Sequence, residues 1–191
     1  MKHEVTTLNT KKTLSASLKK FMLHKSLSKI TVSEIIADCG VNRKTFYYHF
    51  EDIRALMKWT LEQEAIEVVK QFDLLLEYED AITFIMDYVD TNKHILNCVY
   101  DSMGREELKR FFNQDLIGII RSVIDGTEKK LGIHTKESLK VFLTRFFTEA
   151  VTGMLIDWFH DETHPDRKQT IEYFSLIMNK SLPELLLAEQ E

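Results

Sequence analysis

Chain breakers are scarce in this sequence, which contains two prolines and six glycines in 191 residues. Both residue types interrupt helices, so their scarcity favours long helices joined by short connections. Apolar residues also recur every three or four positions, as Leu14, Leu18 and Phe21 do near the N-terminus. Alternation of apolar and polar residues, which is typical of half-buried strands, does not persist. The sequence therefore predicts an all-α fold.

The composition is that of an ordinary globular protein, with 44% apolar and 29% charged residues. The first twenty residues have no apolar core of the kind found in a signal peptide. No run approaches the ~18 uncharged apolar residues that a membrane span needs. Cys39 and Cys98 are the only cysteines and form no C-x-x-C pair, which argues against a disulfide framework. We expect a cytoplasmic protein without a membrane partner.

The charge is distributed unevenly along the chain. Residues 1–50 hold nine Lys or Arg and three acidic residues, whereas the remaining 141 residues hold sixteen basic and twenty-seven acidic ones. A basic segment on an otherwise acidic chain indicates that the first 50 residues alone meet a polyanion. A solvated lysine-rich helix face is the simpler interpretation of the same pattern.

Two short helices are predicted around Gly40. Thr31 and Glu34 form a T-x-x-E capping box, and Gly40 can end the helix in the left-handed conformation. Asn42 and Asp52 are candidate N-caps of the next two helices. The predicted helices span about 9–25, 32–39 and 43–49, followed by a long one from 53. Two short helices joined by a turn that contains Gly fit a helix-turn-helix.

The predicted helix 43–49 has the residues of a DNA-recognition helix. Arg43 and Lys44 occupy its first positions, which reach base edges in the major groove, and the planar fork of Arg43 matches guanine O6 and N7. Tyr47 and Tyr48 lie about 100° apart and cannot both face a core that Phe46 already fills. Packing alone therefore does not explain this helix. The candidate DNA contacts are Thr31, Ser33, Arg43, Lys44, Thr45, Tyr47, Tyr48 and His49.

The stretch T-V-S-E-I-I-A-D-C-G-V-N-R-K-T-F-Y-Y-H-F-E-D-I-R-A-L, residues 31–56, resembles the DNA-binding domain of TetR/AcrR-like bacterial transcription regulators. The resemblance implies base contacts by Arg43, Lys44 and Tyr47, and DNA-backbone contacts by the neighbouring Thr45, Tyr48 and His49. The sequence departs from the family pattern at three positions, which are Ser33, Ile36 and Ile53. The departures at Ser33 and Ile53 bear on half-site preference.

The same resemblance implies a homodimer that binds a palindromic operator in double-stranded DNA, usually as a repressor, under the control of a small-molecule effector. The R-K-T-F-Y-Y-H-F-E-D segment and the aromatic-rich remainder are also similar to a branch that contains activators of dihydroxyacetone kinase operons. In that branch the signal could come from a partner protein. A protein-docking body should expose an apolar patch, whereas a sensor should enclose a cavity.

Five more helices are predicted, over residues 80–89, 93–100, 105–123, 136–159 and 167–187, the last interrupted by Pro183. Loops are expected at 126–135 and 160–166. This pattern divides the chain into a helix-turn-helix domain over residues 1–55 and a helical effector-binding and dimerisation domain over 56–191.

The predicted helix 136–159 is apolar on more than one face, so it has to bury two sides. One side would pack on the core of its own chain and the other on a second copy in a dimer. The alternative is a thick core within one chain. The candidate dimer residues are Phe147, Ala150, Met154, Phe174, Ile177 and Met178. An effector pocket, implied by the resemblance, would draw on aromatic and buried polar groups and would suit an apolar or amphipathic molecule. The candidate ligand residues are His94, Asn97, Tyr100, Phe112, Phe146 and Trp158.

Other chemistry has little support in the sequence. The segment H-D-E-T-H, from His160 to His164, is similar to the zinc motif H-E-x-x-H, but its Glu is misplaced and Pro165 disfavours a helix at His164. No G-x-S-x-G, Gly-rich phosphate loop or C-x-x-C pair occurs. We expect no catalytic residues, no metal and no cofactor, and therefore not an enzyme.

Overall fold

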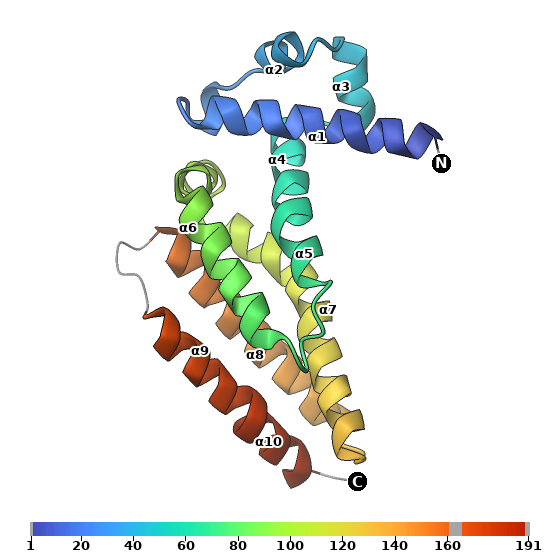
Figure 1. The fold of residues 1–191 in the computed structure, drawn as a ribbon, viewed down its shortest axis with the longest axis vertical. Helices are drawn as coiled ribbons and strands as arrows, with labels where there is room; N and C mark the ends of the chain where they lie inside the picture. Colours follow the sequence, from blue (N-terminus) through green and yellow to red (C-terminus); the bar gives the residue numbers. More distant parts are fainter. Residues whose placement is uncertain (1, 161–165, 190–191) are drawn as a thin grey trace. The chain divides into compact units, whose positions relative to one another are not determined.

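The computed structural model describes residues 2–160 and 166–189, which fold as α-helices without any strand (Figure 1). The predicted all-α class is thereby confirmed. The first elements are α1 (Lys2–Met22), a 3₁₀ turn (Leu27–Lys29), α2 (Val32–Cys39), α3 (Arg43–His49), α4 (Ile53–Leu61), a π turn η2 (Glu62–Ile66) and α5 (Glu67–Val69). The later ones are α6 (Tyr78–Met103), α7 (Arg105–Leu131), α8 (Glu137–His160), α9 (Arg167–Leu176), a π turn η3 (Ile177–Ser181) and α10 (Leu182–Ala188).

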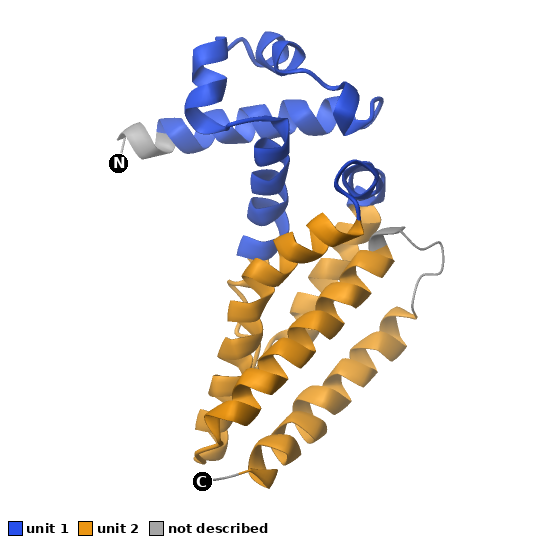
Figure 2. Ribbon diagram, turned by 180° about the vertical axis from the view of Figure 1, so that it is seen from behind, with its two compact units in different colours: residues 1–67, 92–104 blue, residues 68–91, 105–191 orange. Residues whose placement is uncertain are grey.

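The chain divides into two compact units (Figure 2). The first unit comprises residues 1–67 and 92–104, and the second comprises 68–91 and 105–191. The division therefore crosses α6, and α4 belongs to the first unit beyond the predicted boundary at Ala55. A hydrogen bond of 2.9 Å from Thr60 Oγ1 to Ser15 Oγ joins α4 to α1. The assignment of DNA binding and effector control to residues 1–55 and 56–191 stays a prediction.

The core of the first unit is formed by apolar side chains from α1, α2, α3 and α4. Leu14, Leu18, Ile35, Phe46 and Leu56 are fully buried. The helix α1 begins at Lys2, earlier than the predicted start near Asn9, because nothing in the polar segment before the apolar stripe breaks a helix. The bounds predicted for α2 and α3 are confirmed.

Two predictions for the chain after α5 were wrong. The predicted helices 80–89 and 93–100 form the single helix α6, because Asp90–Thr91–Asn92 is polar but contains no breaker. The predicted loop 126–135 is largely helical, since α7 continues through Gly126 to Leu131. At Gly126 the lack of a side chain makes room for a neighbour, because a Cβ there would lie 2.7 Å from Cδ1 of Leu75. Gly132 then ends α7 with a φ of 67°.

The C-terminal helix is continuous through the predicted interruption at Pro183. Proline lacks an N–H and its ring collides with the carbonyl four residues earlier. The π turn η3 precedes Pro183 and widens the helix at that position. Beyond it, Leu182 and Leu186 are buried with Ile124 of α7 and Leu143 of α8.

The helix α8 packs against α7 with a stripe of threonines. Thr144, Thr148 and Thr152 are buried at a spacing of four residues. Their hydroxyls donate to Lys140 O and Thr144 O, each at 2.7 Å, and to Asn113 Oδ1 of α7 at 2.6 Å. Every hydroxyl in this stripe is therefore satisfied, which is what burial of polar groups requires.

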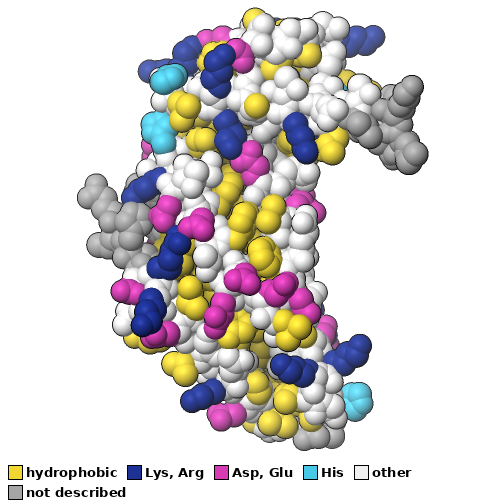
Figure 3. All heavy atoms as spheres, viewed as in Figure 1, with side chains coloured by type: hydrophobic (Ala, Val, Ile, Leu, Met, Phe, Trp, Pro, Cys, Tyr) yellow, Lys and Arg dark blue, Asp and Glu magenta, His cyan; other side chains and the backbone are white. Residues whose placement is uncertain are grey.

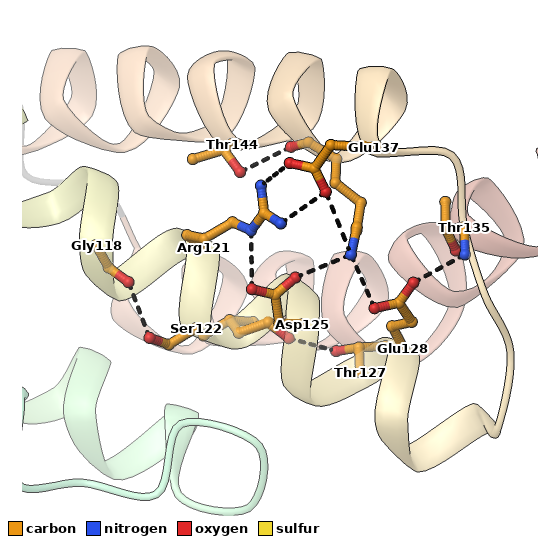
Figure 4. A network of polar contacts seen from close by, with 11 residues as sticks. Gly118, Arg121, Ser122, Asp125, Thr127, Glu128, Thr135, Glu137 and Thr144 are labelled. Atoms are coloured by element: carbon orange, nitrogen blue, oxygen red, sulfur yellow. Dashed lines mark hydrogen bonds and ion pairs between the residues drawn. The ribbon is translucent and has the colours of Figure 1, made fainter.

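A network of ion pairs fastens the start of α8 to the end of α7 (Figure 4). Arg121 binds Glu137 through two nitrogen–oxygen contacts of 2.7 and 2.9 Å and Asp125 at 2.8 Å. Lys140 lies 2.9 Å from Glu128 and 3.3 Å from Asp125. The contact with Glu128 raises the pKa of Lys140, and the contact with Arg121 lowers the pKa of Glu137.

Candidate nucleic-acid interface

The turn between α2 and α3 is built by local capping, as the sequence predicts. Thr31 Oγ1 accepts from Glu34 N at 3.3 Å, and Glu34 Oε2 accepts from Thr31 N at 2.9 Å, which completes the capping box. Gly40 ends α2 with a φ of 65°. Asn42 Oδ1 accepts from Thr45 N at 2.8 Å and caps α3. These bonds fix the direction of α3 relative to α2.

One face of α3 is buried and the other is open. Phe46 is fully buried, and Phe50 just after the helix is nearly so. Tyr47 and Tyr48 are 48% and 71% exposed, so the prediction that the two tyrosines do not share the core with the phenylalanines is confirmed. An exposed aromatic pair on a short helix is not explained by packing.

Arg43 lies across the open face between α2 and α3. Its Nη1 donates to Ser33 Oγ at 3.4 Å, its Nη2 donates to Tyr47 OH at 3.2 Å, and its guanidinium carbon lies 5.4 Å from the centre of the Tyr47 ring. The Lys44 side chain is exposed and forms no ion pair or hydrogen bond with any described residue. Ser33, Arg43 and Tyr47 thus lie together, and Lys44 and Tyr48 are exposed as well. Their contact with DNA stays a prediction.

The remaining predicted contacts have local partners. The hydroxyl of Thr45 donates to Asn42 Oδ1 at 3.0 Å, so this side chain supports the cap as well as facing outward in part. Thr31 is occupied by the capping box described above. His49 is half-buried, and its ring lies edge-to-face with Tyr48 at 4.9 Å between centres.

Acidic residues of the first unit neutralise lysines of α1 and of the turn after it, which the sequence reasoning missed. Lys25 pairs with Glu34, and Lys20 pairs with Asp38. The Lys25 contact, together with the hydrogen bonds from Thr31, lowers the pKa of Glu34 to about 2. Lys20 likewise lowers the pKa of Asp38. The four-residue spacing of Glu34 and Asp38, which puts both on one helix face, was the available signal.

This pairing leaves the positive charge of the first unit concentrated on fewer side chains. Lys11 is placed over the rings of Phe50 and Trp59, 5.5 Å from each centre. Arg43 and Lys44 carry charge on the open face of α3. Among the described residues of the first unit, the positive charges that form no ion pair thus include those of Arg43 and Lys44, which are predicted to contact DNA.

The predicted ligand residues do not form one cluster within either unit. His94, Asn97 and Tyr100 belong to the first unit. His94 Nε2 lies 3.1 Å from Met22 O, and the buried Asn97 Oδ1 has no hydrogen-bond partner among the described residues. The other three, Phe112, Phe146 and Trp158, belong to the second unit. Their assembly into one site stays a prediction.

The predicted dimer residues gather on one surface of the second unit. All six line an apolar groove of about 360 Å³ between α7, α8 and α9–η3, together with Phe146. Phe142 and Phe146 of α8 are 62% and 55% exposed, and their rings stack at 6.1 Å. Figure 3 shows apolar side chains at the surface among charged ones of both signs. We call the groove and these two phenylalanines the α8–α9 face.

A second cavity, of about 550 Å³, lies between the segment after α5 and the helix α7. Its lining is mixed, with Lys70 and Asp115 in an ion pair of 3.0 Å beside apolar residues such as Phe72 and Ile119.

The described residues contain no group of three or more His, Cys, Asp or Glu side chains arranged to hold a metal ion. The H-D-E-T-H segment lies outside the described side chains. Among the described helices, none is long and apolar enough to cross a membrane.

Comparisons with known proteins agree with this geometry. A family model described as bacterial regulatory proteins of the tetR family matches residues 19–58, and a TetR model described as a transcriptional regulator C-terminal region matches residues 77–180, more than half of the chain. The HTH-type dhaKLM operon transcriptional activator DhaS of Lactococcus lactis subsp. lactis (strain IL1403) is 22% identical over 145 residues, which are 76% of each protein.

Two solved structures share the fold. One is described as the dihydroxyacetone kinase operon activator DhaS, with a TM-score of 0.68 at 19% identity over 95% of this chain and 98% of its own. The other is native NalD, the secondary repressor of the MexAB-OprM multidrug efflux pump in Pseudomonas aeruginosa, with a TM-score of 0.58 at 19% identity over 90% and 95%. The matches to both parts of the chain confirm the resemblance seen in residues 31–56. The chain belongs to the TetR family of bacterial transcriptional regulators.

Proposed function

We propose that this regulator binds a palindromic operator as a homodimer through α2 and α3, and that an effector controls its affinity for DNA. The open face of α3 carries the proposal. Arg43 and Lys44 bring positive charge to one end of a helix whose opposite side is anchored by the buried Phe46. Exposed cations and tyrosines on a rigidly capped short helix suit the major groove better than solvent.

The composition of α8 supports the dimer. Thr144, Thr148 and Thr152 are buried on this helix beside Leu143 and Ile156, while Phe142 and Phe146 are exposed. Phenylalanine is among the residues most often buried, and threonine is mostly exposed. The isolated chain therefore buries threonines and exposes phenylalanines on α8, the opposite of the usual pattern. A second copy that covers the α8–α9 face removes the anomaly, and a two-fold axis through that face presents two copies of α3 to two half-sites.

The helix α9 supports the same conclusion. Along α9 only Thr170 is buried, while Tyr173 and Leu176 are exposed. A helix with so much uncovered apolar surface gains little from its own chain. Packing of α8 and α9 against their copies in a second protomer would bury these residues.

Control by an effector is supported by the continuity of α6. The first part of this helix belongs to the second unit, where Arg167 of α9 lies 2.7 Å from Asp87. Its last part belongs to the first unit, where His94 contacts the end of α1 at Met22. A ligand that shifts the first part of α6 would therefore act on a helix whose last part contacts α1. The mixed lining of the larger cavity suits a small amphipathic effector.

Whether the regulator represses or activates transcription belongs to the proposal. Repression is what the family resemblance predicts, and NalD is described as a repressor. DhaS, however, is described as an activator. Control by a protein partner is the second candidate, and the exposed apolar α8–α9 face favours it if the purified chain stays monomeric.

Selection of genomic fragments by the purified protein tests the proposal. We expect one palindromic sequence to be enriched at low salt and to survive at higher salt, because specific contacts add to the salt-sensitive phosphate term. The double variant Arg43→Ala, Lys44→Ala should lose this enrichment. The matched double variant Lys129→Ala, Lys130→Ala removes the same charge from the end of α7 and should retain it. Sequence-blind binding that disappears with salt would contradict operator recognition and favour a partner-dependent regulator.

A further inference from the structure

The guanidinium of Arg43 is held in place before any DNA arrives. Ser33 Oγ accepts from Nη1 at 3.4 Å, and Tyr47 OH accepts from Nη2 at 3.2 Å. The Tyr47 ring lies beneath the guanidinium at 5.4 Å. The three residues come from the start of α2 and from consecutive turns of α3, so the arginine bridges the two helices of the motif.

Both supports are themselves anchored. The Tyr47 ring meets the buried Phe46 edge-to-face, with 5.4 Å between centres and an interplanar angle of 82°. Ser33 lies in the first turn of α2, whose start is fixed by the capping box of Thr31. An arginine otherwise has several rotatable bonds to order on binding, and a side chain ordered in advance loses less entropy when it forms its contacts.

The supported guanidinium keeps the donors that a guanine contact needs. Arginine has five N–H donors, and Ser33 and Tyr47 take one from each terminal nitrogen. Three donors stay free, which is enough for a bidentate contact to O6 and N7. Lys44, beside it, has no such support from the described residues and presents a mobile point charge.

We propose that Ser33 and Tyr47 are positioning residues that make Arg43 the guanine-reading side chain of each half-site, while Lys44 contributes charge without base preference. The inference rests on the proposed operator binding and goes beyond it in two respects. It assigns a role to Ser33, where the sequence departs from the family pattern, and it separates Arg43 from Lys44, to which the resemblance gives the same role.

The test measures base preference position by position, with the full-length protein and a set of operator duplexes that each carry one changed base pair. For Arg43→Ala and for Arg43→Lys, we expect the preference at one base pair of each half-site to fall about 5- to 150-fold. Tyr47→Phe and Ser33→Ala should lower the preference at that same base pair by about 2- to 12-fold, the effect of one hydrogen bond, and leave the other positions unchanged.

Comparison variants separate positioning from a general loss of binding. Lys44→Ala and Tyr48→Phe should weaken binding evenly across all duplexes. Tyr88→Phe removes a phenol hydroxyl from α6, outside the proposed DNA interface, and should leave the preference at every base pair unchanged. Even weakening by Tyr47→Phe and Ser33→Ala, or an unchanged preference, would overturn the positioning role. A wild-type protein without any preferred duplex would instead refute the proposed operator binding.

Discussion

Truncation of Phe146 gives a quantitative test of the proposed dimer. This side chain leaves 55% of its surface exposed, and a phenylalanine offers roughly 200 Å² for burial, so about 110 Å² is available to a partner. At about 25 cal/mol per Å², that area is equivalent to about 3 kcal/mol in each protomer, and it counts twice in a two-fold dimer. Association also orders side chains, so the area converts to affinity at a discount.

We therefore expect Phe146→Ala to weaken the dimer by about 2–3 kcal/mol, which raises its Kd roughly 30- to 150-fold. Sedimentation velocity over a dilution series measures the monomer–dimer equilibrium directly. Leu76→Ala is the matched control, because Leu76 is an exposed apolar side chain on the connection before α6 and does not line the α8–α9 groove. If Phe146→Ala and the wild type had the same Kd while circular dichroism showed both folded, the dimer would not use the α8–α9 face.

Three further predictions concern stability. The pKa of Glu34 is depressed to about 2 by Lys25 and Thr31. The stability that Glu34 contributes to the fold is therefore present above the ordinary pKa of glutamate and is lost as the pH falls toward 2. Thermal melts should show this acid-induced loss of stability in the wild type and a smaller loss in Glu34→Gln. Gly118→Ala should raise the free energy of unfolding by about 0.5–1 kcal/mol through helix propensity, because no atom lies within 4 Å of the added Cβ. Gly126→Ala should raise it less, because the added Cβ displaces Leu75. Urea unfolding measures both variants, and an equal increase in stability would contradict the close packing of Leu75 on Gly126. Lys140→Met should lower Tm by roughly 2–4 °C, the effect of about 1 kcal/mol in a chain of this size. The reason is that Asp125, Glu128 and Glu137 lose a shared cation. An unchanged Tm in calorimetry would show that Arg121 alone is sufficient to neutralise these carboxylates.

The parts of the fold that depend on neighbouring residues were predictable from the sequence. Thr31, Gly40 and Asn42 act on backbone groups within four residues, so their patterns predict the bounds of α2 and α3. The end of α7 was not predictable in this way. Gly126 is a helix breaker by propensity, but the close approach of Leu75, fifty-one positions earlier in the chain, explains why a glycine is tolerated within the helix.

The faces of α8 show the same limit for the candidate sites. Periodicity indicates that this helix is apolar nearly all round, but not that Thr148 is buried while Phe146 is exposed. That choice depends on the partner helix and on hydroxyls that bond within α8. Spacing along the chain likewise does not tell that His94 and Phe112 belong to different units, so the site that would join them stays a prediction.

The π turn at Ile177–Ser181 has a consequence for the lengths that related chains can adopt. Such a turn holds one residue more than a regular helical turn, and each residue advances a helix by about 100° and 1.5 Å. Leu182 and Leu186 reach their buried positions beside Ile124 and Leu143 only in the frame that follows this extra residue. A relative that lost one residue here would turn both leucines away from the core. Insertions and deletions in this segment are therefore limited by helical phase, although none of its five residues is buried.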